Sequence, residues 1–160
     1  MNSGYLPIFL LFATVGLALA LAGARAAWSA LVGLLASAGV VALLPLPPAL
    51  QDMVFVGVWL SIIATAALVY LRRLSPDRWA IPVAINAGIW AGALASLSDR
   101  QVGLLLAMPV VLIFLPARWI VDRGHAIAIK VAASWMIAIA SLALFVSLTP
   151  TPGYKPDHMQ

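Results

Sequence analysis

Lys130 is the residue of this chain most able to carry chemistry, because it is a charged side chain within an apolar run. It lies about one helical turn, roughly 6–8 Å, from the start of that run. A charge in hydrocarbon is costly, so a lysine there is a candidate functional group, and Asp122 is its nearest potential partner in the sequence. The alternative, which we favour, is that the aliphatic stem carries the ammonium to the membrane surface.

Asn86 and Thr65 are uncharged polar residues within two other apolar runs. Asn86 shares a face with Trp90 at helical spacing. An amide in this position either hydrogen-bonds between helices, contributing about 0.6 kcal/mol on average, or lines a polar pathway. We favour the packing role for Asn86. In the alternative, Asn86, Thr65 and Lys130 would belong to one pathway.

Arg118, Asp122 and His125 form the densest polar cluster. Arg118 and Asp122 are four residues apart, a spacing that lets two side chains pair on one helix face. A neighbouring histidine is a residue type suited to proton transfer. We nevertheless expect a solvated cluster at a cytoplasmic helix end. Asp157 and His158 are too sparse to predict a metal site.

Several classes of site are excluded by residue type. The chain has no cysteine and no glutamate, and its five aspartates all fall in predicted loops, tails or helix ends. Proton pumps and cation-coupled transporters normally place carboxylates near the membrane midplane. The metalloprotease, Walker A and nucleophile-elbow motifs are also missing. The sequence therefore predicts a non-enzymatic protein with no cofactor and no metal.

The composition is that of a membrane protein, with 64% hydrophobic and only 9% charged residues. Soluble domains carry roughly a quarter charged residues, and a soluble fold this apolar would expose large aggregating patches. The net charge of +4 does not indicate nucleic-acid binding, because no basic run exceeds two residues.

Six apolar runs predict an all-α fold, a polytopic bundle of six transmembrane helices joined by short loops. A helix needs about 20 apolar residues to cross a bilayer. Pro109 and Pro116 interrupt the fifth run, so we expect a kinked helix there, with a broken helix as the alternative. We expect the first run to be retained, although small residues around Arg25 resemble a signal-peptide cleavage site. The runs are 5–23, 27–44, 53–71, 79–97, 102–121 and 126–148, within a transmembrane domain of residues 1–148 that precedes a mobile, proline-rich tail of residues 149–160.

Small residues recur at four-residue spacing within the runs, which lets neighbouring helix backbones approach closely. The longest of these ladders lies in residues 79–97, which we predict to be the central helix. The predicted packing residues are Ala84, Gly88, Gly92 and Ser96 in that run, Gly33 and Ser37 in the second, and Gly57 and Ser61 in the third.

The distribution of basic residues predicts the orientation. If both termini lie outside, seven of the nine Lys and Arg residues face the cytoplasm, as the positive-inside rule requires. Trp28, Trp79 and Trp119 lie close to these arginines, and tryptophan prefers the headgroup level. Short loops and the Ala/Leu-rich composition fit a bacterial inner membrane. The cytoplasmic residues would be Arg25, Arg72, Arg73, Arg78, Arg118, Arg123 and Lys130, with Arg100 and Lys155 opposite.

Two functional hypotheses follow. The leading one is an accessory or assembly subunit, or a homo-oligomer, whose partners are the lipid bilayer and other membrane subunits or itself. The runner-up is a small permease or channel for a neutral or weakly polar solute, lined by Asn86, Thr65 and Ser61 and by the kinks at Pro109 and Pro116. An intramembrane enzyme is a third class without a catalytic constellation behind it.

Overall fold

The computed structural model describes residues 6–71, 75–97 and 101–149, and within these the secondary structure is entirely helical. Six helical segments cross the bundle, because α5, η2 and α6 follow one another as a single bent segment. This confirms the predicted all-α bundle. The elements are α1 (Leu6–Leu19), α2 (Ala24–Ala42), η1 (Pro48–Leu50), α3 (Gln51–Leu68), α4 (Pro76–Leu97), α5 (Gln101–Ala107), η2 (Met108–Ile113), α6 (Phe114–Asp122) and α7 (Ala126–Leu148).

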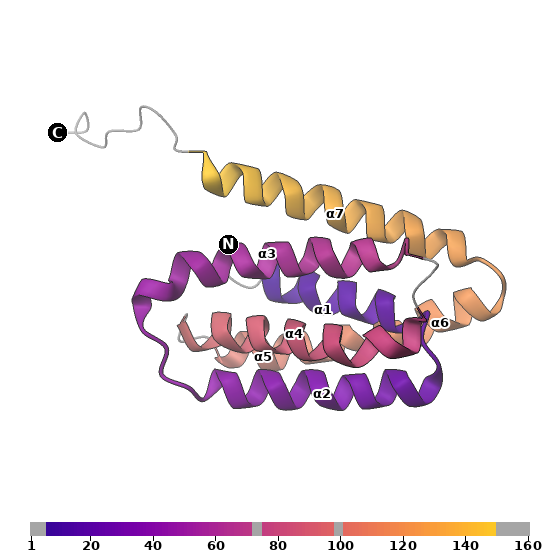
Figure 1. Ribbon diagram of the computed structural model, residues 1–160, viewed down its shortest axis with the longest axis horizontal. Coiled ribbons are helices and arrows are strands. Elements are labelled where there is room, and N and C mark those ends of the chain that lie inside the picture. The colour runs from indigo at the N-terminus through magenta and orange to yellow at the C-terminus, as the bar shows by residue number, and fades with distance from the viewer. Residues whose placement is uncertain (1–5, 72–74, 98–100, 150–160) are drawn as a thin grey trace.

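Successive segments run in alternating directions, so the start of α1 and the end of α7 lie at the same end of the bundle (Figure 1). Five segments are long and apolar enough to cross a membrane, and α1 is a shorter apolar helix. Its 14 residues rise about 21 Å, less than the roughly 30 Å hydrocarbon core. The chain thus has the helices of a multi-pass membrane protein.

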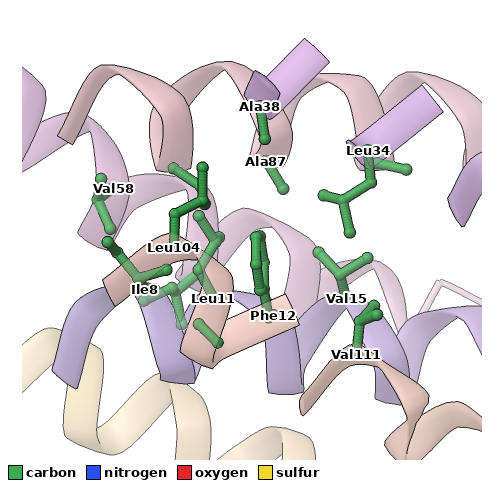
Figure 2. Packing of buried hydrophobic residues seen from close by; sticks show 14 of the residues in the cluster. Ile8, Leu11, Phe12, Val15, Leu34, Ala38, Val58, Ala87, Leu104 and Val111 are labelled. Carbon is green, nitrogen blue, oxygen red and sulfur yellow. The ribbon is translucent and has the colours of Figure 1, made fainter. Parts of the chain in front are cut away.

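α1, rather than α4, occupies the centre of the bundle, which corrects the prediction for residues 79–97. α1 packs against α3, α4, the bent α5–η2–α6 segment and α7. Nine of its 14 residues are buried, against nine of 22 in α4. Neighbouring helices therefore surround this short helix over most of its surface. Figure 2 shows Ile8, Leu11, Phe12 and Val15 of α1 among Leu34, Ala38, Val58, Ala87, Leu104 and Val111.

α2 and α4 form the most extensive helix pair, and glycines determine how closely they approach. A Cβ added at Gly88 would collide with the Ser37 hydroxyl and the Leu34 carbonyl of α2. A Cβ added at Gly92 would collide with the Ala38 carbonyl. The longest small-residue ladder therefore packs within the chain.

Serine hydroxyls reinforce the same interface. The Ser37 hydroxyl lies 2.7 Å from the Gly33 carbonyl of its own helix and 3.3 Å from the Ile85 carbonyl of α4. At the other end of the pair, the Ser96 hydroxyl donates to the Leu44 carbonyl. Ser37 and Ser96 thus both donate to backbone carbonyls, so their hydroxyl groups are hydrogen-bonded in an apolar setting.

The fifth segment is continuous, but the 3₁₀ stretch η2, here called the bend, separates its α-helices α5 and α6, a geometry between the predicted kinked helix and the broken alternative. Pro109 lies in the 3₁₀ turn η2 and Pro116 in the first turn of α6, where a missing N–H costs little. The bend packs on α1 at Gly16, where an added Cβ would lie 2.8 Å from the Val111 carbonyl. The glycine of α1 therefore gives room for the bend.

Helix ends differ from the predicted runs by up to four residues: α1 ends at Leu19 rather than 23, α2 begins at Ala24 rather than 27, and α3 ends at Leu68 rather than 71. α4 begins at Pro76, three residues earlier than expected, because proline is favoured at the first helical position. Pro82 consequently lies inside α4 rather than in its first turn. α7 has the predicted bounds. Pro150 and the remainder of the predicted tail lie outside the described residues.

Candidate functional site

All the arginine and lysine residues that the structure describes lie at one end of the bundle, here called the basic end. The adjoining ends of α1 and α2, of α3 and α4, and of α6 and α7 lie there (Figure 1). Asp52 lies in the first turn of α3, at the opposite end. Arg72, Arg73, Arg100 and Lys155 lie outside the described residues. The basic end contains Arg25, Arg78, Arg118, Arg123 and Lys130.

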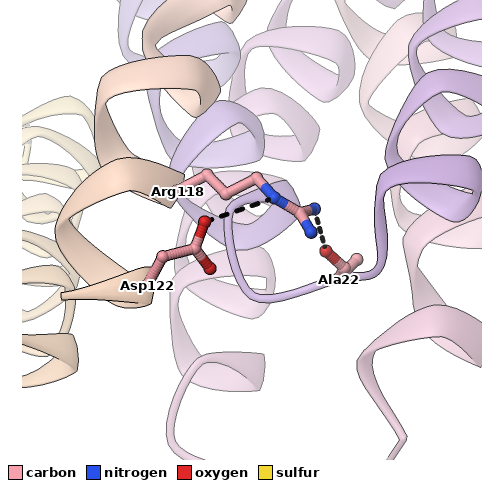
Figure 3. A network of polar contacts seen from close by, with 3 residues as sticks. All are labelled: Ala22, Arg118 and Asp122. Carbon is pink, nitrogen blue, oxygen red and sulfur yellow. Dashed lines mark hydrogen bonds and ion pairs between the residues drawn. The ribbon is translucent and has the colours of Figure 1, made fainter. Parts of the chain in front are cut away.

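Three hydrogen bonds tie the elements of the basic end together. Arg118 Nη1 donates to the Ala22 carbonyl at 2.8 Å (Figure 3). The Gly23 amide donates to Asp77 Oδ1 at 2.6 Å, which joins the start of α2 to that of α4. The Tyr70 hydroxyl donates to the Lys130 carbonyl at 2.6 Å, joining α3 to α7. Each bond links residues distant in sequence, so together they fix the relative positions of the turns.

The predicted cluster of Arg118, Asp122 and His125 is only partly assembled. Arg118 Nε lies 3.9 Å from Asp122 Oδ2, at the outer limit of an ion pair (Figure 3). The Asp122 side chain is 66% exposed, and solvent-exposed pairs contribute about 0–1 kcal/mol. His125 is exposed just before α7 and is not part of this pair. The arginine therefore acts chiefly as a tie to the α1–α2 turn.

A cavity of about 320 Å³ opens between α1, α3, α4 and α7 at the basic end. Among the described residues that line it, Lys130 is the only charged one, and it is half-buried. The sequence singled out Lys130 and Trp79 but gave no sign that they share a cavity, because the other lining residues are ordinary apolar ones. These are Ala18, Leu19, Leu21, Leu68, Val69, Leu71, Pro76, Ala80, Val83, Ala126 and Ile127.

Asn86 connects α4 to α3 at the surface of their interface. Its amide nitrogen donates to Ser61 Oγ at 2.8 Å, and its carbonyl oxygen accepts from Trp90 Nε1 at 3.2 Å. The Trp90 ring in turn lies over Gly57, where an added Cβ would be 2.6 Å from Cε3. This geometry is that of the favoured packing role, and it explains why a glycine stands opposite the indole.

The structure brings Asn86 and Ser61 together but does not place them in the cavity that Lys130 lines. Thr65 is buried in α3 with 1% exposure, and Asn86 is exposed on α4. Lys130 lines the cavity, whereas Asn86, Thr65 and Ser61 do not. Pro109 and Pro116 lie outside its lining as well. A continuous polar route through the described part of the chain is therefore not formed by these residues.

α7 is the least buried of the five long segments. Only 11% of its most apolar 18-residue stretch is buried, against 28–50% for the other four. Exposed residues three or four positions apart form one face of this helix, here called the α7 face. This face was not among the predicted packing faces, although Ser134 and Ala138 have the four-residue spacing of a small-residue ladder. The α7 face comprises Ile127, Val131, Ser134, Ala138, Ser141 and Phe145.

Among residues 6–71, 75–97 and 101–149, no group of three or more His, Cys, Asp or Glu residues could hold a metal ion. Comparison with protein-family models, with curated proteins and with solved structures finds no match for this chain.

Proposed function

We propose that this chain is a non-enzymatic multi-pass protein of a bacterial inner membrane that functions as a homo-oligomer, assembled through the α7 face. The observation that carries the proposal is the exposure of α7 along its whole length. Lipid tails are as apolar as leucine, so helices associate in membranes by close packing rather than by a hydrophobic force. Ser134, Ala138 and Ser141 are small enough to allow such packing.

Trp135, which is exposed beside the α7 face, also supports assembly through α7. This residue lies nine residues into α7, about 14 Å along the axis, and is 67% exposed. Tryptophan is enriched at the headgroup level rather than in the hydrocarbon interior. Contact with a helix of a second copy would remove this indole from lipid. A two-fold axis would place the same face of both copies in contact, the commonest symmetry of homo-oligomers.

The small-residue ladder of α4 no longer supports assembly. Gly88 and Gly92 contact α2 of the same chain, so leucine at either position would first disturb the fold. Assembly therefore has to be tested on the α7 face. In the accessory-subunit form of the hypothesis, a helix of another protein would occupy this face instead.

Disulfide cross-linking tests the proposal cleanly, because the chain has no native cysteine. Single cysteines at Ser134, Ala138 and Ser141 in reconstituted vesicles should give dimers on mild oxidation. Ala36→Cys, an exposed residue on α2, is the matched control and should stay monomeric. Monomer at every α7 position, or equal cross-linking at Ala36, would overturn the proposal.

The permease hypothesis has weaker support. A permease needs its polar residues to converge on a path through the membrane. The cavity described above lies at one end of the bundle and is lined by Lys130 but by none of the uncharged polar candidates. We therefore do not carry this second function further.

A further inference from the structure

The cavity at the basic end has the composition of a lipid site rather than a solute site. The described residues of its wall are apolar apart from Lys130, and its 320 Å³ corresponds to roughly ten waters at about 30 Å³ each. Water is poorly held in an apolar cavity, because each molecule needs two to four polar partners. An acyl chain meets no such requirement. The cavity therefore favours an apolar occupant over a hydrated one.

Lys130 provides a charge that the protein does not neutralise within the described residues. Two described aspartates lie at this end of the bundle. Asp77 accepts from the Gly23 amide, and Asp122 faces Arg118. The lysine is half-buried beside the cavity, so its charge is less hydrated than that of a fully exposed one. An anionic group at the cavity mouth would be attracted to it.

Trp79 indicates how deep in the membrane the cavity mouth lies. It lines the cavity and is 43% exposed, close to Arg78 at the start of α4. Tryptophan next to basic residues is typical of the boundary between hydrocarbon and headgroups. A lipid entering here would have its phosphate near Lys130 and an acyl chain between α1, α3, α4 and α7.

We propose that this cavity binds one anionic phospholipid. The charge complementarity with Lys130 selects an anionic over a zwitterionic headgroup, and the apolar wall selects a lipid over free phosphate. Basic pockets between helices on the cytoplasmic side are a recognised setting for anionic lipids. This inference does not rest on assembly through the α7 face, although Ile127 belongs both to that face and to the cavity wall.

Lipid titration of the full chain in neutral detergent tests headgroup selection. Phosphatidylglycerol should raise the thermal unfolding midpoint saturably, at concentrations where phosphatidylcholine does not. Lys130→Gln should weaken the apparent affinity about fivefold, the effect of losing one interfacial cation. Arg25→Gln, at the same end but outside the cavity, should leave it unchanged. Equal effects of the two lipids, or full selectivity in Lys130→Gln, would overturn the proposal.

A cavity-filling variant tests the acyl chain separately and does not depend on Lys130. Ala126 lines the cavity, and Ala128 is exposed on the same helix outside it. Ala126→Leu should abolish the phosphatidylglycerol effect, and Ala128→Leu should retain it. Inorganic phosphate alone should give no shift. If phosphate reproduces the shift, or if both leucine variants behave alike, the cavity does not bind the lipid.

Discussion

At the scale of single residues, polar groups in this chain serve mostly to join helices. The Asn86 amide donates to Ser61 and accepts from Trp90, and the hydroxyls of Ser37 and Ser96 donate to backbone carbonyls. Such bonds contribute about 0.6 kcal/mol each in measured membrane proteins. The sequence predicted the packing role of Asn86, but it could not identify Ser61 as the partner, because the pair depends on the relative rotation of α3 and α4.

Trp59 is the exception, because its indole nitrogen is buried without a hydrogen-bond partner within the described residues. An unsatisfied buried donor costs about 1–3 kcal/mol. Trp59→Phe removes the donor and keeps most of the volume, including a ring that can still contact Phe55. We expect this variant to be as stable as the parent or more stable, measured by unfolding in mixed micelles.

Trp59→Ala is the contrasting variant at the same position. The side chain is 2% exposed, so truncation leaves a cavity and should cost about 3–5 kcal/mol. A phenylalanine variant as unstable as the alanine variant would show that the indole N–H has a partner after all.

At the scale of elements, the closeness of α2 and α4 depends on particular glycines. Gly88 has no room for a Cβ, whereas Gly39 on α2 has no atom within 4 Å of one. Gly88→Ala should therefore destabilise the protein by about 1–3 kcal/mol, the usual cost of overpacking. Gly39→Ala should be neutral or stabilising by up to about 1 kcal/mol, because alanine has the higher helix propensity. Both are measured by the same micellar unfolding titration.

Equal effects of the two alanine substitutions would contradict the α2–α4 packing. Four-residue spacing in the sequence identified the ladder, since small residues at that spacing share a helix face. It did not identify what the ladder packs against. Whether a small face meets a helix of the same chain or of another depends on the fold, which is why the ladder first pointed to assembly.

At the scale of the whole molecule, the hydropathy pattern predicted six helical segments but not which of them lie at the centre of the bundle and which lie outside. The bounds of α7 follow from its apolar run, and the bend follows from Pro109. The central position of α1 does not follow, because a residue facing lipid and one facing protein are equally apolar. For the same reason, the exposed α7 and the buried α1 have similar composition but opposite environments.

Orientation is the property of the whole molecule that its charges should decide. The alternating helices place Ser75, between α3 and α4, at the basic end, and Ala49, in η1, at the opposite end; both residues are exposed. Because basic loops are retained in the cytoplasm, an impermeant maleimide should label Ala49→Cys in spheroplasts. Ser75→Cys should react only after the membrane is permeabilised.

These two cysteines act as controls for each other, since no native cysteine competes for the reagent. The reversed pattern would place both the start of α1 and the end of α7 in the cytoplasm, and would require some feature stronger than the basic end to set the orientation. Labelling of both positions from the same side would contradict the crossing of α3 itself. It would mean that α3, the helix between the two positions, does not span the membrane despite its length and composition.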